Sequence, residues 1–219
     1  MREQFQGELR GLSDLMVEMT RLVGSAIARA TTALLDGDLT LAETVIAADE
    51  QVDAIQHEIE ERSLSLLALQ QPVATDLRVI VTGLRMSADL ERMGDLARHV
   101  AKLARMRYPN SAIPAELRAI VLQMGQVAER IVAKTGSVIA SRDLDIAVQL
   151  ETDDDAMDAL HRDLFAVILD EGWAHGIETA VDATLCGRYY ERFADHAVSV
   201  ARRVVFLVTG ERAEPRASS

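Results

Sequence analysis

Apolar residues recur at spacings of three and four along most of the chain, which is the period of an amphipathic α-helix. Prolines and short polar turns interrupt this pattern at a few places. We therefore predict six long helices: about 5–35, from the turn at 36–38 to 70, from Pro72 to 108, from Pro114 to 141–143, about 144–172 and about 177–209. Long helices joined by short turns favour an all-α fold of antiparallel bundles.

The two halves of the chain repeat one another. A shift of 105 positions carries Met19 onto Met124 and Asp38 onto Asp143, and in the third helix of each half the shift is 100 positions. The difference falls in the break between the second and third helices, where loops tolerate deletion. This indicates a tandem repeat of a three-helix unit. The predicted division is a first repeat over 1–108, a linker over 109–112, a second repeat over 113–210 and a flexible tail over 211–219.

One acidic motif is written twice, once on the third helix of each half, as Glu91-Arg92-Met93-Gly94-Asp95 and as Glu191-Arg192-Phe193-Ala194-Asp195. Residues four apart lie on the same face of a helix, so the two carboxylates of each motif are neighbours. At about 4 Å and an effective dielectric constant of about 20, such a pair costs on the order of 4 kcal/mol. Solvation, a basic partner or a bound cation can each relieve that repulsion.

A second acidic pair with the same spacing lies on the second helix of each half, as Asp49 with Asp53 and as Asp154 with Asp158. If the second and third helices of a half are adjacent and antiparallel, two acidic pairs face each other. Four carboxylates suit hard cations, or carboxylate-bridged iron, manganese or zinc. Because the apolar stripe of the third helix points the other way, we expect the acids on an outer face, accessible to ions. The alternative to a metal site is an ordinary solvent-exposed acidic face that was duplicated together with the repeat.

Composition limits the classes of function. A net charge of −12 argues against nucleic-acid binding, which needs basic residues to replace counterions. No uncharged apolar run is long enough to span a membrane, and the N-terminus is charged and unlike a signal peptide. The single cysteine, Cys186, excludes an internal disulfide and a Cys-rich zinc module, so we expect it to be a small packing residue. The chain is predicted to be soluble and cytoplasmic.

A ferritin-like di-iron oxidase is the enzymatic alternative. That chemistry uses Glu-x-x-His pairs on two helices of a bundle. None of the five histidines follows a glutamate at that spacing, and the nearest approach, Asp158 with His161, has no counterpart in the first half. The pattern therefore argues against this class.

A histidine phosphotransfer protein is a second alternative, with His99 and His196 as candidate acceptors. A phosphoryl group on His196 would meet the negative charge of Asp195. The two histidines also do not correspond between the halves, because position 99 matches Ser199 and position 196 matches Leu96. We expect both to be surface or groove residues.

A metal-free helical scaffold with an acidic docking face is the third alternative. Arg92 and Arg192 each lie within one turn of the acids and can reduce their repulsion. This alternative differs from a metal-binding regulator only in the absence of metal.

The acidic motifs resemble those of the PhoU family. The resemblance is carried by the segments ADLERMGDLA at 88–97 and YERFADHA at 190–197, with QPVATDLR at 71–78 before the third helix and MREQF at the start. It covers nearly the whole chain, including the tandem six-helix layout. It implies a PhoU-like six-helix fold of two antiparallel three-helix bundles.

Members of that family are cytoplasmic regulators of phosphate uptake and signalling, not enzymes. The resemblance implies a negative regulator that links the ATPase of a phosphate ABC transporter to a sensor histidine kinase, associates with the membrane only through such partners, and needs no organic cofactor. It also implies divalent or trivalent metal ions, iron or zinc before manganese or magnesium. The implied ligands are Asp49, Asp53, Glu91 and Asp95 in one half, and Asp154, Asp158, Glu191 and Asp195 in the other. A homodimer is left open.

Overall fold

The computed structural model describes residues 2–211, and they form six α-helices. The helices are α1 (Arg2–Asp36), α2 (Leu39–Gln70), α3 (Ala74–Arg107), α4 (Ala115–Ser141), α5 (Leu144–Ile168) and α6 (Gly176–Thr209). No strand occurs within residues 2–211, which confirms the all-α prediction. All but one residue of the predicted tail at 211–219 lie outside the described residues.

The helix ends follow local chemistry, and one of them corrects the sequence prediction. Asp38 and Asp143 cap α2 and α5 at equivalent positions, accepting hydrogen bonds from the backbone N–H of Leu41 (2.9 Å) and of Asp145 (2.8 Å). The fifth helix ends at Ile168 rather than near 172. The segment that follows forms a turn in which the Asp170 side chain accepts the Gly172 N–H at 2.7 Å.

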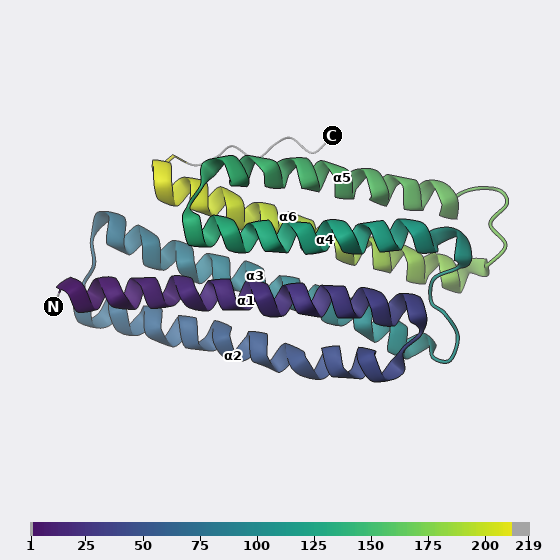
Figure 1. The fold of residues 1–219 in the computed structure, drawn as a ribbon, viewed down its shortest axis with the longest axis horizontal. Helices are drawn as coiled ribbons and strands as arrows, with labels where there is room; N and C mark the ends of the chain where they lie inside the picture. The colour runs from purple at the N-terminus through teal and green to yellow at the C-terminus, as the bar shows by residue number, and fades with distance from the viewer. Residues whose placement is uncertain (1, 212–219) are drawn as a thin grey trace.

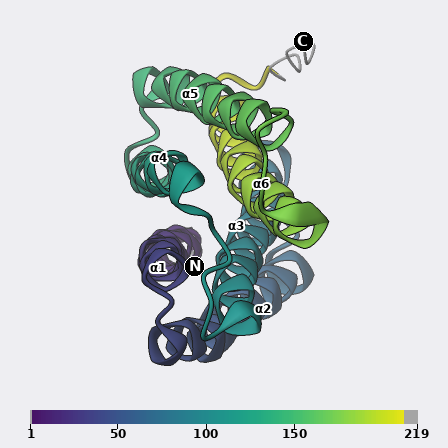
Figure 2. The same cartoon turned by 90° about the vertical axis from the view of Figure 1, so that its right-hand side faces the viewer.

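Each half forms a three-helix bundle, and the two bundles lie side by side (Figure 1). Within each half every helix contacts the other two, so the predicted adjacency of the second and third helices is confirmed. The bundles meet through α1 against α4 and α3 against α6 (Figure 2). Equivalent helices of the two repeats therefore pack against one another, and both pairs run antiparallel.

Helices α1 and α4 approach each other closely at two points. A Cβ atom on Gly125 would lie 2.6 Å from Thr31 Cγ2, and one on Gly136 would lie 2.6 Å from Thr20 Oγ1. Thr20 is the repeat equivalent of Gly125, and Thr31 is the equivalent of Gly136, because both pairs are 105 positions apart. The same threonine-on-glycine contact is thus made at two places related by an approximate twofold axis.

The core continues from one bundle into the other. Tyr190 and Phe193 of α6 are fully buried, and the Tyr190 hydroxyl shares a 2.7 Å hydrogen bond with Thr31 Oγ1 of α1. Cys186 is also buried, as expected for a packing residue. None of the six described helices is long and apolar enough to cross a membrane.

Replacing Gly136 by alanine tests the contact between the bundles. The added methyl group meets Thr20 Oγ1 at 2.6 Å, so the free energy of unfolding should fall by about 1–3 kcal/mol. Adding Thr20→Ala to this variant removes that atom and should restore part of the loss. Chemical denaturation measures both effects.

Gly7→Ala is the matched control, because no heavy atom lies within 4 Å of its added methyl group. Alanine favours the helix, so this variant should be at least as stable as the parent chain. If Gly136→Ala were as stable as Gly7→Ala, α1 and α4 would not pack as closely as described.

Candidate functional site

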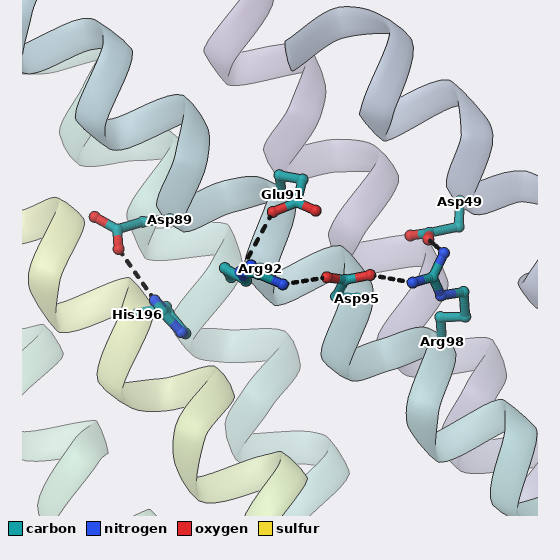
Figure 3. A network of polar contacts seen from close by, with 7 residues as sticks. All are labelled: Asp49, Asp89, Glu91, Arg92, Asp95, Arg98 and His196. Carbon is teal, nitrogen blue, oxygen red and sulfur yellow. Dashed lines mark hydrogen bonds and ion pairs between the residues drawn. The ribbon is translucent and has the colours of Figure 1, made fainter. Parts of the chain in front are cut away.

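In the first half, the predicted acids meet where α2 packs on α3. Asp49 projects from α2 toward Asp95 on α3, and the guanidinium of Arg98 lies between them (Figure 3). Arg98 Nη1 is 2.7 Å from Asp49 Oδ2, and Nη2 donates to Asp95 Oδ1. A basic side chain therefore compensates two of the four acids.

A second arginine completes this network. Arg92 Nη1 donates to Asp95 Oδ2 at 2.8 Å, and its Nε lies 3.7 Å from Glu91 Oε2. The expected pairing of Arg92 with the acids is confirmed. Arg98 was missed, although its position three residues after Asp95 places it on the same helix face.

Burial raises the energetic cost of these charges. The pKa of Asp49 is raised above its ordinary value, first by burial and also by Asp53 and Asp95, while Arg98 acts in the opposite direction. The pKa of Glu91 is raised by burial and by the neighbouring charge of Asp95. The first-half acids thus lie in a negative, partly desolvated environment that the arginines only partly offset.

Gly94 permits the close approach of α2 at this point. A Cβ atom there would lie 3.1 Å from Asp49 Oδ1 and 3.2 Å from Val52 Cγ1. The glycine of the motif therefore brings the two acidic pairs together. Ala194 takes its place in the second half and is buried.

The second half has the same acids but a different set of counter-charges. Arg188 pairs with Glu191, whereas the position equivalent to Arg98 holds the buried Val198. Among the described residues, neither Asp154 nor Asp158 forms an ion pair.

The result is a concentration of uncompensated negative charge. Burial, followed by the charges of Asp158 and Asp195, raises the pKa of Asp154 to about 7, and Arg202 opposes this only in part. Burial and Asp158 also raise the pKa of Asp195, while Arg188 acts to lower it. The second half is therefore the half in which a bound cation would relieve the most repulsion.

The acidic surface is less exposed than the sequence predicts, with Asp195 as the exception. The side chain of Asp49 is only 5% exposed, and those of Asp95 and Glu191 are 14% and 16% exposed. The physical reason is that α3 packs against α1, α2 and α6, so the face opposite its apolar stripe is largely covered by α2. Asp195 alone of the eight predicted ligands is exposed.

The carboxylates suit a hard cation in their chemistry, but the side chains are not arranged as a coordination shell. Within residues 2–211 no group of three or more His, Cys, Asp or Glu side chains is placed to hold a metal ion. In the first half, Arg98 occupies the space between Asp49 and Asp95. In the second half no arginine takes that place, so its donor set fits a cation better.

A third polar network joins the two halves beside the first-half acids. Asp89 of α3 accepts hydrogen bonds from three residues of α6: His196 Nδ1 at 3.0 Å, Ser199 Oγ at 3.2 Å and Arg203 Nε at 2.8 Å. Although burial acts to raise the pKa of Asp89, the bonds from His196 and Arg203 hold it below its ordinary value. These contacts place His196 in the interface between α3 and α6.

The other candidate phosphoacceptor also lies between α3 and α6. The His99 ring stacks on Tyr189 with a centroid distance of 5.2 Å. Tyr189 and Ser199 are the equivalents of Asp89 and His99, so the stack and the Asp89–Ser199 bond occupy corresponding places. Both histidines are partly buried between α3 and α6.

A model of the PhoU domain matches the chain twice, over residues 16–104 and 121–204. The chain belongs to the PhoU family. One match falls in each predicted half, which confirms both the resemblance and the duplicated all-α fold.

Close relatives and solved structures agree with this assignment. The chain is 50% identical to "Phosphate-specific transport system accessory protein PhoU homolog 2" of Mycobacterium tuberculosis, covering 96% of this chain and 99% of the relative. It is also 50% identical to homolog 1 of Mycobacterium leprae, over 96% and 95%. Crystal structures of PhoU from Pseudomonas aeruginosa and of the phosphate transport system regulatory protein PhoU from Streptococcus pneumoniae superpose with TM-scores of 0.82 and 0.83, at 28% and 27% identity. They cover 94% and 96% of this chain and all of each solved chain.

Removal of Arg98 tests its role in compensating the first-half acids. Arg98→Gln leaves Asp49 buried without its ion-pair partner, so the free energy of unfolding should fall by roughly 2–3 kcal/mol. Arg92→Gln is the control, because Arg92 is 63% exposed and Asp95 keeps Arg98, so the loss should stay below about 1 kcal/mol. Denaturation of both variants in a chelating buffer measures the difference. Equal losses would show that Arg98 does not have the compensating role assigned to it.

Proposed function

We propose that this PhoU protein is a non-catalytic, cytoplasmic regulator of phosphate uptake. The observation that carries the proposal is the full-length likeness to accessory proteins of phosphate-specific transport systems, with both repeats present. An accessory protein acts through contacts with transporter components. Two bundles that pack against each other through α1 with α4 and α3 with α6 present surfaces for such contacts.

We further propose which partners the protein contacts and in which direction it regulates them. The protein contacts the ATPase of a phosphate ABC transporter and a sensor histidine kinase, and when phosphate is plentiful it favours the kinase state that keeps starvation genes off. The family likeness supports this role. It reaches the membrane through these partners, since none of its described helices is suited to span one.

We also propose a metal ion in each half. Asp154, Asp158, Glu191 and Asp195 would hold it in the second half, where like charges accumulate without an intervening arginine. Asp49, Asp53, Glu91 and Asp95 would hold it in the first half, where Arg98 must turn away from Asp49 and Asp95. Iron or zinc suits such carboxylates, and the ion would crosslink the second and third helices of a half.

A metal-free scaffold is the competing function. The arginine network of the first half favours it for that half, because Arg92 and Arg98 already supply positive charge to the acids. The buried position of Asp49 argues against the acidic docking face that this alternative required.

Affinity capture from phosphate-replete cells tests the choice of partners. The tagged protein should recover a phosphate transporter ATPase and a sensor kinase, identified by mass spectrometry. The tag alone in the same cells is the control. Recovery of neither partner would contradict the regulatory proposal.

Elemental analysis tests the metal proposal. Glu191→Ala/Asp195→Ala should lose the metal of the second half and melt at a lower temperature than the parent loaded with metal. Glu91→Ala/Asp95→Ala should lose that of the first half. Asp163→Ala, which removes an exposed acid elsewhere on α5, should retain both. Parent protein that carries no metal after purification without chelators, and takes up none from solution, would refute the site.

A further inference from the structure

A groove between α3 and α6 gathers arginines in a chain whose net charge is −12. Its volume is about 330 Å³, within the range of small-molecule sites. Residues of both repeats line it: Thr82 and Arg85 from α3, and Asp195, Ser199, Arg202, Arg203 and Phe206 from α6. It therefore lies across the junction of the two halves.

The guanidinium groups in this groove are only partly engaged. Arg203 uses its Nε to bind Asp89, which orients the side chain and does not employ its Nη atoms. Arg202 forms an ion pair of 3.7 Å with Glu151 and acts to lower the pKa of Asp154, and its buried Nε has no hydrogen-bond partner among the described residues. Arg85 is exposed and forms no ion pair within residues 2–211. The groove thus offers more N–H donors than it satisfies.

The equivalent place at the other end of the α3–α6 contact shows what such a groove can hold. Thr82 corresponds to Asp182, which is 4% exposed. Asp182 Oδ1 accepts a hydrogen bond from Arg107 Nη2 at 3.0 Å, and Arg107 also pairs with Glu178. There the protein itself supplies the anion that an arginine binds. At the groove Thr82 replaces the acid and Leu207 replaces the arginine, so the groove arginines come from other positions and have no carboxylate at position 82 as a partner.

The remaining groups fit one class of anion. Asp89 is neutralised by its three donors, so it does not oppose a bound anion strongly. Asp195 is the only carboxylate among the groove-lining residues. It can accept the proton of hydrogen phosphate, whereas sulfate has no proton to donate at neutral pH and is repelled.

We propose that this groove binds a phosphate group, with Arg85 and Arg202 as its principal donors and Asp195 selecting the protonated anion. The group is inorganic phosphate or the phosphate of a small metabolite. Binding would draw α3 and α6 together and so couple phosphate to the contact between the two halves. The site does not depend on the regulatory partners proposed above, but it shares Asp195 with the metal site proposed for the second half, so it is tested in metal-free protein.

Isothermal titration calorimetry on the full chain, in a chelating buffer, tests the site. Inorganic phosphate should bind saturably at one equivalent, and sulfate at least about tenfold more weakly. Arg85→Gln and Arg202→Gln should each weaken phosphate binding by about tenfold or more, because each loses charge-assisted hydrogen bonds. Arg105→Gln, an exposed arginine of α3 outside the groove, should bind like the parent.

Two further measurements sharpen the test. Thr82→Asp places a carboxylate where its repeat equivalent has one, so it should abolish phosphate binding while the circular dichroism spectrum stays helical. Adenosine monophosphate distinguishes the sources: tighter binding than phosphate indicates a metabolite, and weaker binding indicates the free ion.

Four outcomes would overturn the proposal. They are the absence of saturable binding up to millimolar phosphate, binding that is seen only when the chelator is omitted, equal affinity for sulfate, and an Arg105→Gln variant as weak as Arg85→Gln. Because these measurements use the purified protein without partners, they succeed or fail independently of the capture experiment.

Discussion

Negative charge must be accommodated where the second helix of each repeat packs against the third, and much of the molecule is arranged around that requirement. Carboxylates on neighbouring helices repel each other more as water is removed from them. In the first repeat Arg92 and Arg98 form ion pairs with the acids, and Gly94 allows α2 to approach α3 closely. The second repeat keeps the acids and places a valine where the key arginine would be. The same acidic motif therefore has different neighbouring positive charges in the two repeats.

This difference bears on how duplicated proteins divide their functions. A repeat whose acids are partly offset by arginines gains less from an added cation than a repeat that retains more of the repulsion. The same division recurs between α3 and α6, where Asp182 is bound by Arg107 at one end and Thr82 lies among arginines at the other. In both places one repeat pairs its charge internally and the other does so less completely.

Much of this architecture was accessible from the sequence, and the failures have identifiable causes. Helical periodicity located all six helices, because each carries an apolar stripe that must be buried. The duplicated motifs established the repeat. A single apolar stripe does not predict the exposure of the acids, because α3 is covered on several sides by α1, α2 and α6. Small residues such as Gly94 and Ala97 allow that covering, and they contribute little to a hydrophobic pattern.

Contacts between distant residues were the hardest to foresee. The bonds from α6 to Asp89 join residues more than a hundred positions apart, and no local spacing specifies them. The pairing of Thr20 with Gly136 and of Thr31 with Gly125 depends on how two helices slide past each other. Once the repeat is known, however, the second of these contacts follows from the first by symmetry.

That reciprocal pairing has a consequence for the origin of the fold. In a twofold homodimer, each contact between two residues is repeated with the roles of the two subunits exchanged, and such an interface is called isologous. The Thr20–Gly136 and Thr31–Gly125 contacts are related in this way. A single ancestral repeat bearing a threonine and a glycine compatible with both roles would have been able to pair with a second copy of itself. Fusion of two copies would then have made their association intramolecular, so that it no longer depended on protein concentration. It would also have released each copy to change its charges separately, so this chain can be regarded as a homodimer whose subunits have diverged while covalently joined.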